Sequence, residues 1–233
     1  MLARALLIVI ATWAGPIGAW AFEQADLERL LRTGLCAACD LRDSDLSGTR
    51  LARANLIESG LMPLDLAGAD LRRANLRGAP LARAALSGAD LRQARLERAD
   101  LRRADMRDTD LRGADLRQAN LTAARLDGAK LARADLEGAR LTGARLTAAR
   151  LQGAKLDGAV LLRASLSGAD LSGASLRGAF LSETDLRGAR LARTDLSGAE
   201  LAGALGLTQF QLNAACGDEA TRLAPYFTVP RCE

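Results

Sequence analysis

The fold is decided by the repeat seen in Ala89-Asp90-Leu91-Arg92-Gln93-Ala94-Arg95-Leu96-Glu97-Arg98, in which leucine returns at every fifth residue. The same spacing runs from Leu41 to Leu201, and Met106 is the one departure among these 33 positions. A step of five turns an α-helix by about 140°, and on a β-strand an odd step sends successive leucines to opposite faces. Only a backbone that changes direction within each pentapeptide brings all of the leucines to one axis. The spacing therefore predicts a solenoid.

The residue two positions before each leucine is small, which supports the same geometry. Alanine fills 25 of these 33 positions, and Leu64 is the one large side chain among them. The other three positions of each pentapeptide are mostly polar or glycine. We therefore expect two residues of every five inside and three outside, around a narrow packed core. Burial of one leucine contributes about 1.5–3 kcal/mol, so the leucine column is a large enough core to fold alone.

Several pentapeptides share one stricter pattern. They begin with Ala89-Asp90-Leu91, Ala114-Asp115-Leu116, Ala119-Asn120-Leu121 and Ala169-Asp170-Leu171. This pattern resembles the pentapeptide-repeat family, whose consensus is A(D/N)LXX. The resemblance implies an all-β solenoid, namely a right-handed quadrilateral β-helix with four pentapeptides per coil and about eight coils over residues 36-201. Residues n and n+20 would then be stacked about 4.8 Å apart.

The first 21 residues have the pattern of a secretory signal peptide. Arg4 precedes an apolar run at residues 6-10, and Ala19-Trp20-Ala21 offers a cleavage site before Phe22. A short membrane anchor is the alternative, but Gly15-Pro16 interrupts the run, and an apolar span of about 20 residues is missing. We expect cleavage after Ala21 and a periplasmic or secreted protein without a transmembrane anchor.

Short helices are expected at both ends of the repeat run, because an open solenoid exposes its core at each end. Residues 22-35 form the predicted N-terminal cap, with leucines at helical spacing within residues 27-31. Residues 202-233 form the predicted C-terminal cap and tail, in which Thr208-Gln209-Phe210-Gln211 fits a capping box at the start of a helix.

The four cysteines flank the repeat run in pairs. In an oxidising compartment this arrangement predicts one disulfide between Cys216 and Cys232, and another between Cys36 and Cys39. Three alternatives stay open. The Cys36-Cys39 segment could be a redox motif, although no βαβ pattern surrounds it. All four thiols could bind zinc, although the pairs lie at opposite ends of the rod, and Cys36 and Cys39 could be a reduced core pair.

Catalysis has little basis in this sequence. The chain has no histidine, which is the commonest general base and metal ligand. Serine and acidic residues recur as outward repeat positions, without a partner that the sequence identifies. We therefore expect no enzyme activity, no cofactor and no metal.

Basic residues gather in the position before leucine over one part of the run. They are Arg125, Lys130, Arg140, Arg145, Arg150 and Lys155. With a 20-residue coil, Arg125 stacks on Arg145 and Lys130 stacks on Arg150, so this basic band could bind an anion. The alternative interpretation is local neutralisation by Asp127, Asp135, Glu137 and Asp157.

The charge balance argues against nucleic-acid mimicry and nucleic-acid binding. Some pentapeptide-repeat proteins are understood to mimic DNA through an acidic rod and to inhibit type II topoisomerases, but this chain has a net charge of +4. Aromatic residues for base stacking are nearly absent from the run, and charges of opposite sign alternate along it. We therefore expect no nucleic-acid partner, whereas a polyanion of the cell envelope fits the charge.

Val160 and Phe180 stand one expected coil apart in the normally polar position before leucine, and Leu162 is close to them in sequence. We expect an apolar patch there. The apolar tail around Tyr226 and Phe227 is the expected cover, and a partner site is the alternative.

These observations favour a non-catalytic structural or protein-interaction scaffold of the bacterial cell envelope. The alternative function is binding of an anionic ligand or envelope polyanion through the basic band at residues 125-155. The partner would be a protein or an envelope polyanion, and rods could also pair end to end as a homodimer.

Overall fold

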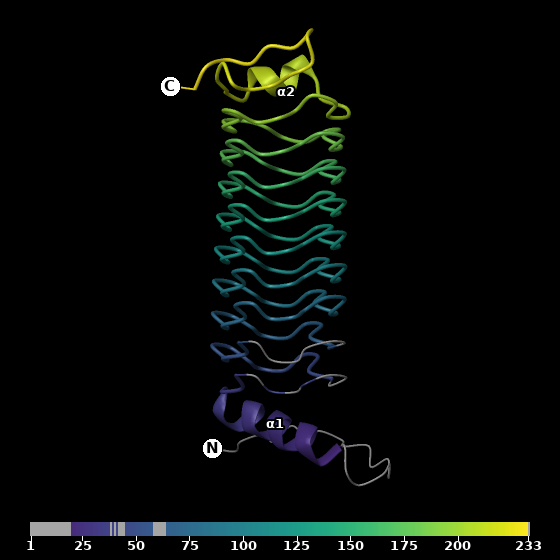
Figure 1. Cartoon of the computed structure of the whole chain (residues 1–233), viewed down its shortest axis with the longest axis vertical. Helices are drawn as coiled ribbons and strands as arrows, with labels where there is room; N and C mark the ends of the chain where they lie inside the picture. The colour runs from purple at the N-terminus through teal and green to yellow at the C-terminus, as the bar shows by residue number, and fades with distance from the viewer. Residues whose placement is uncertain (1–19, 38, 40, 42–44, 58–63, 233) are drawn as a thin grey trace, which may run out of the picture.

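The computed structural model describes residues 20-37, 39, 41, 45-57 and 64-232, so the basic and apolar parts of the predicted signal peptide lie outside the described residues. The described chain forms a long rod (Figure 1). Helix α1, Trp20–Thr33, lies at one end, and helix α2, Gln209–Asn213, lies near the other (Figure 1). Within the described part of the chain, no helix is long and apolar enough to cross a membrane.

Each pentapeptide makes one side and one corner of the coil. The residue before leucine forms a single parallel β-bridge to the residue 20 positions further on, as Asp70 does with Asp90. Leucine then points inward, two residues make the turn, and alanine points inward before the next bridge. The turn is closed by the Ala74 N–H, which donates to the Leu71 carbonyl at 3.0 Å. The chain reaches a corner after every bridge, so the sheet contacts in the described residues are isolated bridges rather than extended strands.

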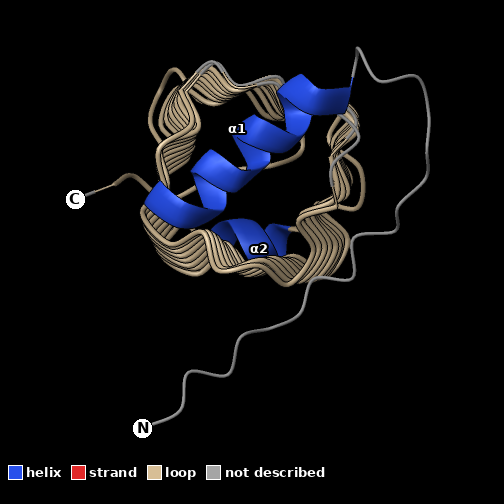
Figure 2. Cartoon of the chain, turned by 90° about the horizontal axis from the view of Figure 1, so that it is seen from below, coloured by secondary structure: helices blue, strands red, loops and turns tan. Residues whose placement is uncertain are grey.

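Neighbouring coils are joined by backbone hydrogen bonds that repeat in the same register. The Leu71 N–H donates to the Asp90 carbonyl at 2.8 Å, and the Arg73 N–H donates to the Arg92 carbonyl at 2.9 Å. Viewed from one end, the coils superimpose as a four-sided frame (Figure 2). A 20-residue coil therefore stacks like positions of the sequence in columns along the rod.

Leucine and alanine fill the interior of the frame, and threonine replaces alanine at four described positions, of which Thr49 is partly buried. Thr109, Thr184 and Thr194 are completely buried. Each hydroxyl donates to the carbonyl of a leucine in the preceding coil, as Thr184 Oγ1 does to Leu161 O at 2.7 Å. The core accepts these hydroxyls because their hydrogen-bonding capacity is satisfied inside the frame.

The second residue of each turn adopts a positive φ, which makes the corners type II turns. Glycine suits this conformation and occupies it at Gly143, where φ is 64°. Fourteen described corners instead use another residue, such as Arg133 at 58° or Ala148 at 55°. A left-handed conformation costs such a residue about 1–2 kcal/mol, which the hydrogen bonds to the coils above and below must offset.

The two helices lie over the ends of the frame. Leu30 of α1 is 1% exposed and joins the core, and α1 crosses the open end of the frame (Figure 2). At the other end, the predicted capping box is present between Thr208 and Gln211. The ladder continues past Leu201, but its spacing lengthens, because Asp195 pairs with Cys216 and Glu200 pairs with Arg222.

Candidate functional site

The six residues of the predicted basic band are distributed over all four sides of the rod. Bridges place Arg125 with Arg145 in one column and Lys130 with Arg150 in another, while Arg140 and Lys155 belong to the remaining two columns. Three of the six have a carboxylate partner: Arg125 with Asp105 at 3.7 Å, Arg145 with Asp127 at 3.3 Å, and Lys155 with Asp135 at 3.9 Å. The band is therefore a partly neutralised ring rather than a single surface.

The basic excess of the repeat run gathers instead at one corner, which we call the basic corner. It consists of the stacked segments 50-53, 70-73, 90-93, 110-113, 130-133, 150-153, 170-173 and 190-193. Its eleven cations are Arg50, Arg53, Arg72, Arg73, Arg92, Arg112, Lys130, Arg133, Arg150, Arg190 and Arg193, and its four carboxylates are Asp70, Asp90, Asp110 and Asp170. The other three corners of residues 41-201 share 16 basic and 17 acidic residues. They are close to neutral, so the positive field of the rod originates at the basic corner.

An open groove of about 610 Å³ runs along the basic corner. Five of its seven lining residues are arginines, and the lining consists of Ala52, Arg53, Arg72, Arg73, Arg92, Gln93 and Arg112. The lining includes no carboxylate from the described residues. An anion in this groove would therefore contact guanidinium groups directly.

Three of the groove arginines form hydrogen-bonded ion pairs with aspartates that lie outside the groove lining. Arg72 donates to both carboxylate oxygens of Asp70, through Nε at 2.8 Å and through Nη2 at 2.6 Å. Arg92 and Arg112 bond Asp90 and Asp110 in the same way. The Arg72 side chain is 50% exposed but that of Asp70 only 25%, so the arginine lies on the solvent side of the pair.

These pairs orient the guanidinium groups and leave part of each one free. The hydrogen bonds from Arg72 lower the pKa of Asp70. This carboxylate therefore stays ionised at neutral pH and remains hydrogen-bonded to the arginine. The Nη1 atoms of Arg72, Arg92 and Arg112 have no acceptor among the residues that the structure describes. Three donor groups therefore remain available, one on each successive coil.

Seven cations of the basic corner have no carboxylate within 4.0 Å in the described part of the chain. They are Arg50, Arg53, Arg73, Lys130, Arg133, Arg150 and Arg193. Reading the positions before leucine along the chain misses this corner, because its charges also occupy the two turn positions. The sequence does contain this information: adding the charges of residues that are 20 positions apart identifies the basic corner.

The predicted apolar patch exists, but its predicted cover is wrong. Val160 and Phe180 are bridged neighbours, and the Phe180 side chain is 51% exposed. The tail leaves Phe180 exposed: Arg222 pairs with Glu200, one coil beyond Phe180, and Tyr226 is itself exposed. Phe227 packs partly against the core and Tyr226 lies against Phe227, with 4.6 Å between ring centroids. Leu162 is half-buried beside the patch.

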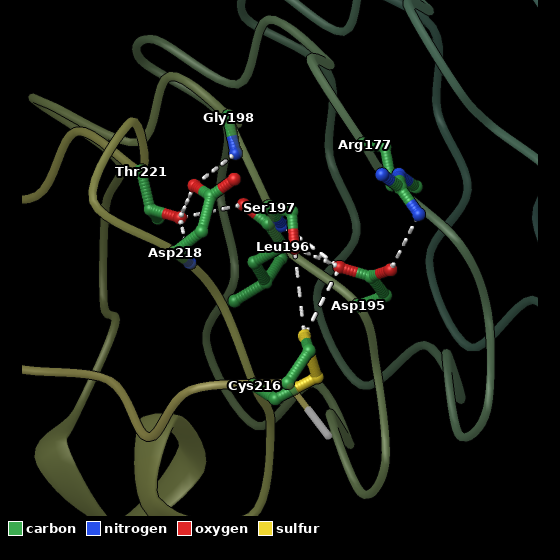
Figure 3. The surroundings of a disulfide bond; sticks show 9 residues. Arg177, Asp195, Leu196, Ser197, Gly198, Cys216, Asp218 and Thr221 are labelled. Carbon is green, nitrogen blue, oxygen red and sulfur yellow. Dashed lines mark hydrogen bonds and ion pairs between the residues drawn. A yellow bond between two sulfur atoms is a disulfide. The ribbon is translucent and has the colours of Figure 1, made fainter.

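Both predicted cysteine pairs are bonded in the structure. Cys216 joins Cys232 with 4.8 Å between Cα atoms, and Cys36 joins Cys39 with 5.3 Å between Cα atoms. Asp195 Oδ1 lies 3.2 Å from Cys232 Sγ and accepts from Ser197 Oγ (Figure 3). Asp195 and the two cysteines approach one another as a metal site would, but both sulfurs are committed to the disulfide.

The N-terminal pair has the opposite electrostatic surroundings. Arg29 of α1 places Nη2 2.8 Å from Cys39 Sγ, whereas the C-terminal pair lies beside a carboxylate. Cys36 and Cys39 are each 1% exposed, so this disulfide is enclosed between α1 and the first coil. Its burial gives it a packing role at this end of the rod.

Comparison with protein-family models gives one match, described as Pentapeptide repeats. It covers residues 36–62, 64–93, 81–118, 119–158, 144–182 and 164–203, in 8 copies. Comparison with curated proteins gave no match.

Several solved structures are similar to this chain. HetL, a pentapeptide repeat protein involved in heterocyst differentiation regulation in the cyanobacterium Nostoc sp. strain PCC 7120, is 34% identical, with a TM-score of 0.49. That match covers 83% of this chain and 96% of HetL. QnrB1, a plasmid-mediated fluoroquinolone resistance protein, is 23% identical with a TM-score of 0.43, over 75% of this chain and 90% of QnrB1.

Proposed function

Because this chain belongs to the pentapeptide-repeat family, whose members fold as right-handed quadrilateral β-helices, we propose that it is a non-catalytic interaction scaffold of the bacterial cell envelope. The observation that carries this proposal is the uniform core. Leucine and alanine fill the inward positions coil after coil, so the outward side chains are held at a fixed spacing along four corners. Such an array suits recognition of an extended partner surface.

The exposed apolar patch supports a protein partner. Phe180 is half-exposed on a surface whose other bridge positions are mostly polar, and Val160 and Leu162 extend the apolar area beside it. Aromatic side chains of this kind are enriched at the centres of protein interfaces. The patch is therefore the proposed contact site of the scaffold.

We also propose export, capping and about eight coils for this rod. Cleavage after Ala21 would remove only the first two residues of α1, and Leu30 would stay in place over the open core. At the other end, Gln211 bonds the last coil through two carbonyls, which suits a cap. Both disulfides would form in the oxidising compartment that export provides.

Site-specific crosslinking in intact cells tests the scaffold. A photo-crosslinking amino acid placed at Phe180 should capture a discrete protein partner, because this side chain is exposed within the patch. The matched control places the same group at Ser165, which lies on another side of the rod. Equal capture at both positions, or recovery of the protein only from the cytosol with its first 21 residues intact, would contradict the proposal.

A further inference from the structure

We propose that the basic corner is a binding site for a linear polyphosphate, a phosphate polymer without bases, that lies parallel to the rod axis. This site goes beyond the scaffold function and uses a different corner from the Phe180 patch. Three observations carry it: the concentration of charge, the orientation of the groove arginines, and the repeat of both along the rod.

The carboxylates of this corner neutralise only part of its positive charge. Eleven cations face four carboxylates there, while the rest of the repeat run is close to neutral. In the described part of the chain, Arg53, Arg73, Lys130 and Arg150 have no carboxylate within 4.0 Å. Like charges stacked on neighbouring coils repel one another, so a bound anion would remove a cost that the free protein carries.

The paired arginines are oriented before any ligand arrives. The Asp70 carboxylate fixes Arg72 through Nε and Nη2, and the Nη1 atom is left without an acceptor among the described residues. Arg92 and Arg112 repeat this arrangement on the next two coils. Because the guanidinium positions are already fixed, binding costs less side-chain entropy than it would with free arginines.

The spacing of these donors suits tetrahedral oxyanions. Guanidinium groups on neighbouring coils repeat about every 4.8 Å, which lets one anion accept hydrogen bonds from two coils. A phosphate group has more oxygens than a carboxylate, and they point in several directions, so it can bond arginines of two coils and still present oxygens to a third donor. The groove between Arg53 and Arg112 therefore favours phosphate.

The length of the corner indicates a polymer rather than a single ion. From Arg50 to Arg150 the column rises five coils, or about 24 Å, and the cations continue beyond the groove at Lys130 and Arg150. Several phosphates on one chain would occupy these positions together and gain from multivalency. No aromatic residue lies in the corner segments, so bases have nothing on which to stack, and the observations favour a plain polyphosphate backbone over single-stranded nucleic acid.

Titration calorimetry on the full chain tests the site with linear polyphosphate, inorganic phosphate and single-stranded DNA of equal charge as probes. Polyphosphate should bind at least about tenfold more tightly than inorganic phosphate. It should also bind more tightly than the DNA. Absence of polyphosphate binding at low ionic strength, or tighter binding of the DNA, would overturn the proposal.

Two triple variants separate a built site from diffuse charge. Arg73→Gln, Lys130→Gln and Arg150→Gln together remove three basic-corner cations that have no ion-pair partner in the described structure, so the fold should be retained. This variant should lose about tenfold in polyphosphate affinity. The control Arg83→Gln, Arg103→Gln and Arg140→Gln removes the same charge from another corner and should lose less than about threefold. Equal losses in both would show that only net charge matters.

The experiments on the scaffold proposal and on the polyanion-site proposal have independent outcomes. The Phe180 crosslinking reports on a different corner, so a missing protein partner leaves the polyphosphate titration interpretable, and the reverse also holds.

Discussion

The side-chain amide of Gln211 donates to the backbone carbonyl of Leu186 at 2.8 Å. The same nitrogen donates to the Ala189 carbonyl at 2.9 Å. In the middle of the rod, the equivalent alanine carbonyl accepts from the backbone of the next coil, as Ala169 does from the Arg190 N–H. At the end of the rod, the Gln211 side chain therefore donates the hydrogen bond that a backbone N–H of the next coil donates elsewhere.

Replacing Gln211 with leucine should destabilise the protein. The buried carbonyls of Leu186 and Ala189 would lose this donor, and the free energy of unfolding should fall by about 1–3 kcal/mol. Asn213→Ala changes an exposed residue of the same helix and should have a smaller effect. Urea unfolding of both variants makes the comparison, and equal losses would remove the special role of Gln211.

The corner conformation predicts opposite effects for two exchanges between alanine and glycine. Ala148 holds a φ of 55° that glycine adopts without strain, so Ala148→Gly should raise the free energy of unfolding by up to about 1 kcal/mol. Gly143→Ala introduces the same strain, and the added Cβ would have no atom within 4 Å outside the adjacent residues of the chain. A loss of similar size would therefore measure the cost of the backbone conformation. Thermal unfolding of the two variants should move in opposite directions.

The stability of the rod should fall in acid, and the pairs of aspartate with arginine should account for part of the loss. The hydrogen bonds from Arg102 lower the pKa of Asp100 below its ordinary 3.8, and Arg107 acts in the same way on Asp105. A folded pKa below the unfolded value stabilises the protein above the unfolded pKa, and this contribution disappears as the pH falls through the folded pKa.

Arg102→Gln tests this dependence. Without its partner arginine, Asp100 should have a more ordinary pKa, so the fall in the free energy of unfolding between about pH 5 and pH 2 should be shallower than in the original chain. Arg83→Gln removes an arginine that has no carboxylate partner within the described residues and serves as the control. Parallel pH profiles for all three proteins would contradict the assignment.

The two disulfides should differ in their contribution to stability. Cys216 and Cys232 are 16 residues apart, and closing a loop of this size is worth about 3 kcal/mol in the chain-entropy model. Cys36 and Cys39 are 3 residues apart, so replacing both with serine should cost less. Denaturant unfolding gives both values, and limited proteolysis of the Cys216→Ser/Cys232→Ser variant should cut the tail first.

Much of the rod structure can be predicted from the sequence, because the same leucine and alanine positions set the register in every pentapeptide. Leucine and alanine set the inward positions, and the coil length taken from the family resemblance places Val160 beside Phe180 and Arg125 beside Arg145, where the structure has them. No long-range information beyond the coil length is needed. The same regularity explains why the charge of each corner can be summed from residue numbers.

The tail could not be derived in the same way. Insertion of α2 lengthens the spacing, so Cys216 rather than residue 215 pairs with Asp195. The path of the tail then depends on close packing at Gly217, where an added Cβ would lie 2.7 Å from Thr221 Oγ1 and 2.8 Å from Val229 Cγ1. Such contacts belong to individual atoms and leave no periodic signal, which is why the predicted cover of the apolar patch was wrong.

The 20-residue coil also determines how this rod can change in evolution. Gain or loss of one pentapeptide leaves the leucine and alanine positions intact, but it moves every later side chain to the neighbouring corner. Gain or loss of four pentapeptides restores the alignment and changes only the length. Duplication in units of five residues can therefore exchange one surface for another without disturbing the interior, and units of 20 can lengthen the basic corner while keeping it straight.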